Sequence, residues 1–125
     1  MRTPSRWTPV ALLAGAILVA SIVPIPGAVP EEGGGISTSA VFHFLGYATL
    51  AALIGVALLV RQPPVRGSGT GIASASSYGV LIECLQYPIA YRTFSYLDML
   101  VNAGGATLGA LVLLCVLAAR SDDHR

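Results

Sequence analysis

The sequence has no lysine and few charged residues of any kind. Only 10% of its 125 residues are charged, against about 25% in an average soluble domain. Its seven basic residues are all arginines, and the net charge is +1. This composition excludes intrinsic disorder, which needs low hydrophobicity and high charge. It also excludes a nucleic-acid partner, because there is no excess of positive charge to neutralise phosphates.

Several sequence signatures of catalytic and metal sites are missing. The two cysteines, Cys84 and Cys115, form no C-x-x-C motif and are interpreted as small apolar residues that do not form a disulfide. No HExxH-type spacing, phosphate-binding glycine loop or nucleophile elbow occurs. We therefore expect no metal and no cofactor.

Long apolar stretches dominate the sequence. Hydrophobic residues make up 54% of the chain, and its mean hydropathy is +0.74. A membrane-spanning helix needs about 20 apolar residues, and four stretches meet or approach this length. They are too long, and too rich in alanine and leucine, for strands. We predict an all-α membrane protein, a bundle of four transmembrane helices in a single domain of residues 1–125, with the lipid bilayer as its main partner. The predicted helices lie at about 7–26, 39–60, 71–91 and 97–119.

Prolines and glycines mark the predicted connections. All eight prolines fall between the predicted helices or near their ends, where a missing backbone N–H costs least. Glu31–Gly35 in the first connection, and Pro63-Pro64 with Gly67-Ser68-Gly69 in the second, predict flexible linkers. The first stretch has some features of a signal peptide, but it lacks a clean small-x-small cleavage site. A retained first helix is therefore the favoured interpretation.

The arginines predict the orientation in the membrane. Lysine and arginine are enriched in cytoplasmic loops, and with four spans six of the seven arginines fall on one side. Only Arg92 falls on the other side, in the third connection. We therefore predict a multi-pass protein of the cell membrane with both termini cytoplasmic. The six arginines are Arg2, Arg6, Arg61, Arg66, Arg120 and Arg125.

Small residues spaced four apart predict how the helices pack. Such pairs let two helix backbones approach closely in a membrane, and Gly105 with Gly109 is the pair that we expect to mark helix packing. Every predicted helix carries one pair: Ala11 and Gly15, Ala51 and Gly55, Ala75 and Gly79, Gly105 and Gly109.

Polar residues gather at the outward level of the predicted bundle. On each of three helices they are three or four residues apart, so they share a helix face. Glu83 lies within a predicted span, where a carboxyl needs a partner, and we expect Arg92 to be the counter-ion of Glu83 or Asp98. The predicted ligand-binding residues are His43, Tyr47, Glu83, Gln86, Arg92, Asp98 and Asn102.

These residues resemble the motifs of the VanZ-like family. Glu83-Cys84-Leu85-Gln86 resembles its E-x-x-Q, and Arg92, Ser95 and Asp98 its R-x-x-S-x-x-D. Asn102, Gly105 and Gly109 resemble its N-x-x-G-x-x-x-G, and His43-Phe44 with Tyr47 its upstream element, so that the likeness spans residues 43–109. Ser39 and Ala40 stand where the family often carries Asp-Lys.

The resemblance implies a small multi-pass membrane protein with a role in the cell envelope. The namesake of the family is linked to resistance to the glycopeptide antibiotic teicoplanin. The resemblance does not imply a reaction, so whether this protein is an enzyme stays open.

Three functions are compatible with these residues. In the first, which we favour, an outward polar pocket binds or modulates a cell-envelope component through the headgroup of an envelope lipid or precursor, and Arg92 attracts an anionic group. In the second, Glu83 and Asp98 are the catalytic acid and base of an intramembrane enzyme that acts on a lipid-linked substrate. In the third, the polar groups only satisfy one another and hold the helices together. Complete mutual hydrogen bonding would favour the third function, and an open outward cavity the first two.

Overall fold

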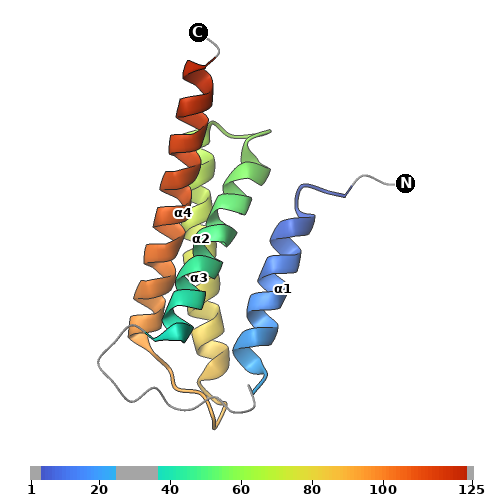
Figure 1. Cartoon of the computed structure of the whole chain (residues 1–125). Coiled ribbons are helices and arrows are strands. Elements are labelled where there is room, and N and C mark those ends of the chain that lie inside the picture. The colour runs from blue at the N-terminus through green and yellow to red at the C-terminus, as the bar shows by residue number, and fades with distance from the viewer. Residues whose placement is uncertain (1–3, 25–36, 124–125) are drawn as a thin grey trace.

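The computed structural model describes residues 4–24 and 37–123, and these residues form a bundle of four helices (Figure 1). The helices run alternately in opposite directions and are joined in the order of the sequence. This confirms the all-α prediction and the number of helices in the described part. Their bounds are α1 Thr8–Ile22, α2 Thr38–Leu58, α3 Pro64–Gln86 and α4 Tyr96–Asp122.

Serine caps and prolines set most of the helix ends. The Ser37 hydroxyl accepts a hydrogen bond from the Ala40 N–H at 2.9 Å at the start of α2, which satisfies one of the free N–H groups there. α1 ends at Ile22, earlier than predicted, because Val23 precedes Pro24 and takes an extended conformation. α3 likewise ends at Gln86 rather than near residue 91, since Pro88 follows. The described prolines lie outside the helix interiors, as predicted.

The second predicted linker is wrong, because α3 begins at Pro64 and includes Gly67, Ser68 and Gly69. Proline suits the first position of a helix, where its missing N–H is not needed. Gly67 and Ser68 are buried, and an added Cβ at Gly67 would lie 3.4 Å from the Gly55 carbonyl oxygen. Composition suggested a linker, but these small residues let α3 pack closely on α2. The other predicted linker, Glu31–Gly35, lies outside the described residues.

Glycines bring α4 against α2. A Cβ added at Gly105 would collide with the carbonyl of Phe44, and one added at Gly109 with the carbonyl of Ala48. Both glycines therefore lie where α4 approaches the backbone of α2 most closely. The pairs on α2 and α3 are also buried: Ala51, Gly55, Ala75 and Gly79.

The pair on α1 does not mark an interface. Ala11 and Gly15 are exposed, and a Cβ added at Gly15 would have no neighbour within 4 Å. α1 makes far fewer contacts with α2 and α3 than α2, α3 and α4 make with one another. Figure 1 shows α1 set beside the other three helices.

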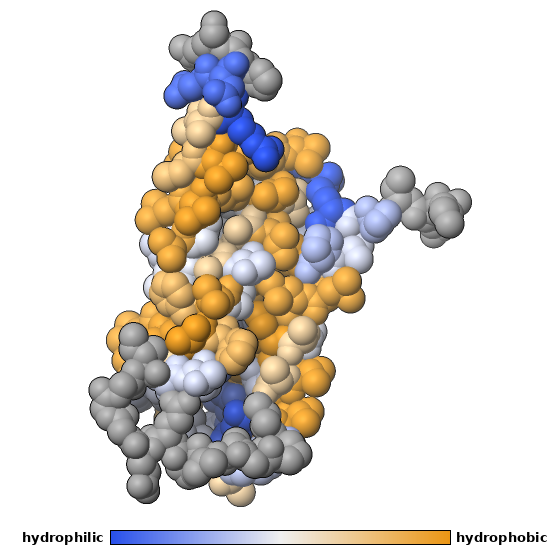
Figure 2. Space-filling view, in the orientation of Figure 1, coloured by the Kyte–Doolittle hydropathy of each residue, from blue (hydrophilic) through white to orange (hydrophobic). Residues whose placement is uncertain are grey.

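The surface of the bundle is largely apolar. Twenty-two large apolar or aromatic side chains are exposed among the described residues. Figure 2 shows one face of the bundle, where hydrophobic residues cover most of the helices and the most hydrophilic residues lie toward the ends. By length and composition, α2 and α4 could cross a membrane. α1 has only 15 residues, and α3 carries several serines. Helix length and composition therefore support two of the four predicted spans.

The Gly109 contact predicts a large effect of one methyl group. Gly109→Ala should lower the free energy of unfolding by about 1–3 kcal/mol, because the methyl group has no room beside the Ala48 carbonyl. The matched control is Gly104→Ala on the same helix, where the nearest atom is a Phe44 ring carbon 3.7 Å away. The control should be neutral or stabilising by up to about 1 kcal/mol. Denaturant unfolding of the two variants in detergent measures both values, and equal stabilities would contradict the packing described.

Candidate functional site

Glu83 joins the end of α3 to the start of α4. Its side chain is fully buried, and Oε2 accepts a hydrogen bond from the backbone N–H of Ser95 at 3.0 Å. Ser95 is the N-cap residue of α4. The other carboxyl oxygen, Oε1, is buried and has no hydrogen-bond partner in the described part of the chain.

The start of α4 resembles a capping box in which one member has been exchanged. The Ser95 hydroxyl accepts from the Asp98 N–H at 3.1 Å, which is the first half of the motif. In a complete box the acidic side chain three residues later would accept from the N-cap N–H, but here Glu83 holds that N–H. The Asp98 carboxylate is half-buried and hydrogen-bonds to none of the described residues.

His43, Tyr47 and Asn102 lie together between α2 and α4. His43 Nδ1 is 3.3 Å from Asn102 Oδ1, and the His43 and Tyr47 rings are nearly parallel, with centroids 6.3 Å apart. Tyr47 is 1% exposed and Asn102 0%. The Tyr47 hydroxyl and Asn102 Nδ2 have no hydrogen-bond partner among the residues described.

A glycine on α3 lets these side chains reach the level of Glu83. A Cβ added at Gly79 would lie 3.0 Å from Asn102 Nδ2 and 3.2 Å from a Tyr47 ring carbon. Glu83 follows Gly79 by one turn on the same helix face. Ser95 links Glu83 to Asp98, because its N–H donates to the Glu83 carboxyl and its hydroxyl accepts from the Asp98 N–H. Three helices thus bring together five of the seven predicted ligand-binding residues, called here the polar cluster: His43, Tyr47, Glu83, Asp98 and Asn102.

Gln86 and Arg92 have a different role, because they bind the end of α1. Gln86 Nε2 donates to the Ser21 carbonyl at 2.9 Å. Arg92 Nη2 donates to the carbonyls of Ala20 and Val23, both at 3.0 Å. The last carbonyls of a helix have no partner within the helix and carry partial negative charge.

The predicted ion pair between Arg92 and Glu83 or Asp98 is therefore wrong. The guanidinium binds the free carbonyls at the end of α1, while Glu83 binds a backbone N–H. Two tyrosines that the sequence analysis did not single out also hold α1. Tyr78 donates to the Ala14 carbonyl at 2.7 Å, and Tyr91 to the Ile22 carbonyl at 2.6 Å. Nothing in their sequence spacing distinguishes them from ordinary aromatic residues.

The polar cluster lies at the end of the bundle opposite most of the arginines. Arg6 precedes α1, Arg61 and Arg66 lie at the junction of α2 and α3, and Arg120 lies in the last turn of α4. Figure 1 shows these helix ends on the same side of the bundle. The cluster is instead placed by the last turn of α3 and the first turns of α2 and α4.

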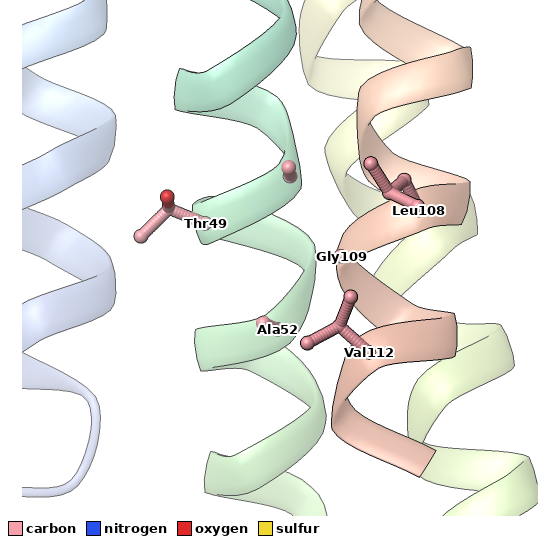
Figure 3. Close-up of a pocket in the computed structure, with 6 residues that line it drawn as sticks. Thr49, Ala52, Leu108, Gly109 and Val112 are labelled. Atoms are coloured by element: carbon pink, nitrogen blue, oxygen red, sulfur yellow. The ribbon is translucent and has the colours of Figure 1, made fainter. Parts of the chain in front are cut away.

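A surface groove lies elsewhere, between α2 and α4 (Figure 3). It has a volume of about 280 Å³ and is mainly apolar. Its one hydroxyl, on Thr49, donates its proton to the Leu45 carbonyl at 2.8 Å. The groove is lined by Ala48, Thr49, Ala52, Leu108, Gly109 and Val112.

This groove is not the predicted outward polar pocket, since it contains no residue of the polar cluster. The cluster itself has a closed interior, where Glu83 and Asn102 are fully buried, and a half-buried rim formed by His43 and Asp98.

The remaining titratable groups form no second site in the part of the chain described. Cys84 and Cys115 are free thiols on exposed positions. No group of three His, Cys, Asp or Glu side chains is arranged to hold a metal ion there.

Comparisons of the chain with protein-family models, with curated proteins and with solved structures find no significant match. The resemblance to the VanZ-like family therefore stays a prediction that rests on the motif residues.

Arg92 should control how firmly α1 is attached. Arg92→Ala removes two hydrogen bonds to the end of α1 and should lower the opening free energy of α1 by about 1–2 kcal/mol. Amide hydrogen exchange would then speed up in residues 8–22 and stay unchanged at the start of α4. The control is Arg120→Ala, at the other end of the bundle. Unchanged exchange in α1, or faster exchange at Ser95 and Asp98, would contradict this role.

Proposed function

We propose that this chain is a VanZ-like integral membrane protein whose polar cluster binds the headgroup of a cell-envelope lipid or lipid-linked precursor. The bundle crosses the membrane, and the cluster lies at its outward end. The groups around this headgroup are His43, Tyr47, Glu83, Asp98 and Asn102.

The apolar surface supports the membrane location. Soluble monomers rarely expose contiguous apolar patches larger than a few hundred Å², whereas apolar side chains cover the described helices of this bundle. α2 and α4 have the length and composition of membrane spans. With the arginine-rich end in the cytoplasm, the polar cluster faces outward.

The observation that carries the binding function is the incomplete pairing of a buried cluster. Glu83 Oε1, Asn102 Nδ2 and the Tyr47 hydroxyl are buried without partners among the described residues. Leaving one such group unpaired costs about 1–3 kcal/mol. A purely structural network would be expected to pair these atoms with one another, whereas a polar ligand that opens the closed interior of the cluster would supply partners for all three.

The enzyme alternative is favoured by one difference between the two carboxyl groups. Glu83 is fully buried and bound to a backbone N–H, while Asp98 is half-buried and free of hydrogen bonds to the described residues. Acid–base pairs in enzymes use such unequal environments. Turnover of a lipid-linked envelope substrate by the purified protein, abolished by Glu83→Gln, would favour this alternative.

Teicoplanin susceptibility tests the proposed role in the envelope. Expression of the wild-type chain in a susceptible bacterium should raise resistance, and Glu83→Gln or Asn102→Leu should return it to the level of the empty vector. The matched control is Asp122→Asn, because Asp122 is an exposed acidic residue at the opposite end of the bundle. Amounts of each variant in the membrane are compared by immunoblot.

The proposal is overturned if the wild-type chain leaves susceptibility unchanged. It is also overturned if Glu83→Gln and Asn102→Leu, present at wild-type amounts, retain the full effect.

A further inference from the structure

The polar cluster has more acidic than basic groups. It contains the carboxyl groups of Glu83 and Asp98, and its single titratable base is His43. The sequence has no lysine, and Arg92 is bound to the carbonyls of Ala20 and Val23. The other described arginines lie at the far end of the bundle. Among the described residues, no basic side chain with a permanent charge is therefore paired with either carboxyl.

Asp98 is available to a ligand because Glu83 has taken over its capping role. Glu83 Oε2 accepts from the Ser95 N–H, the group that Asp98 would bind in a complete capping box. Asp98 is half-buried, and its carboxylate accepts no hydrogen bond from the described residues.

The buried interior of the cluster points to the same kind of ligand. When the Glu83 carboxyl is ionised, its oxygens accept hydrogen bonds and donate none. Oε1 has no donor within the described part of the chain, although the side chain is 0% exposed. Asn102 Nδ2, also fully buried, is a donor without an acceptor. The fitting ligand supplies N–H donors to the carboxyl groups and an oxygen to Asn102.

We propose that the headgroup bound by the polar cluster carries a primary ammonium group, and this inference rests on the proposed function. The ammonium donates to Asp98 at the rim and to Glu83 Oε1 inside, and an oxygen of the same headgroup accepts from Asn102 Nδ2. This differs from the sequence-based expectation of an anionic group held by Arg92. A primary ammonium has three N–H donors in a compact volume, whereas a trimethylammonium has none. A metal ion fits less well, since no three metal-ligating side chains converge in the described residues.

Lipid binding to the purified full-length chain tests this inference. The probes are phosphatidylethanolamine, phosphatidylcholine and phosphatidylglycerol, added singly to the protein in detergent and followed by native mass spectrometry. We expect phosphatidylethanolamine to bind about tenfold more tightly than phosphatidylcholine, equivalent to about 1.4 kcal/mol. Asp98→Asn and Glu83→Gln should each remove this preference.

The controls separate lost binding from lost folding. Glu83→Gln keeps a side-chain oxygen that can accept from the Ser95 N–H, and circular dichroism checks the helix content of each variant. Asp122→Asn should keep the preference for phosphatidylethanolamine. Soluble ethanolamine is the second source of the same chemistry. If it competes with phosphatidylethanolamine, the ammonium alone is recognised, and if it does not, recognition needs the lipid; both results support an ammonium site.

Three results would overturn the ammonium site. They are equal binding of phosphatidylethanolamine and phosphatidylcholine, preference for phosphatidylglycerol, and an unchanged preference in folded Asp98→Asn and Glu83→Gln. If the cluster variants lose teicoplanin resistance while the lipid preference is absent, this inference fails and the proposed function stands. If resistance does not depend on the cluster, the proposed function itself fails.

Discussion

The hydrogen bond from the Ser95 N–H to Glu83 is the interaction on which the polar end of the bundle depends. It fixes the last turn of α3 to the first residue of α4 and is fully buried at the carboxyl group. An intramolecular hydrogen bond typically contributes about 0.5–1.5 kcal/mol, and this one joins the two helices directly. Because it replaces the capping bond of Asp98, it also determines which carboxyl remains free.

Two kinds of contact hold this bundle together: close packing of helix backbones, and hydrogen bonds from side chains to the carbonyls of α1. α2, α3 and α4 meet through glycine and alanine, with backbone against backbone. α1 is held mainly at its C-terminal end, by polar side chains that donate to its carbonyls. Gln86 and Arg92 therefore position a helix. The other five residues form the polar cluster: His43, Tyr47, Glu83, Asp98 and Asn102. α1 also packs on the core through Val10, Leu13 and Ile17, but it has no glycine-mediated backbone contact like those between α2, α3 and α4.

The number of helices, three of the four small-residue pairs and the convergence of the polar faces follow from spacing in the sequence. The helical start of α3 does not, because Pro63–Gly69 has the composition of a linker. In the structure α3 begins at Pro64, and Gly67 and Ser68 pack on Gly55 of α2. The sequence also does not predict the partner of Arg92, because carboxylates and free helix carbonyls both attract a guanidinium. Which of them Arg92 reaches depends on the path of the connection between α3 and α4. The same path determines that Glu83, rather than Asp98, accepts the hydrogen bond from the Ser95 N–H at the start of α4.

The amide proton of Ser95 tests this account most directly. Its NMR chemical shift reports the hydrogen bond that it donates, and it can be compared in the wild-type chain, Glu83→Gln and Asp98→Asn. A large change of this shift is expected in Glu83→Gln, where an amide replaces the carboxyl group that accepts from the Ser95 N–H, and little change is expected in Asp98→Asn. A large change in Asp98→Asn with little change in Glu83→Gln would show that Asp98 accepts from the Ser95 N–H. This result would contradict the free Asp98 carboxylate on which the proposed ligand site depends.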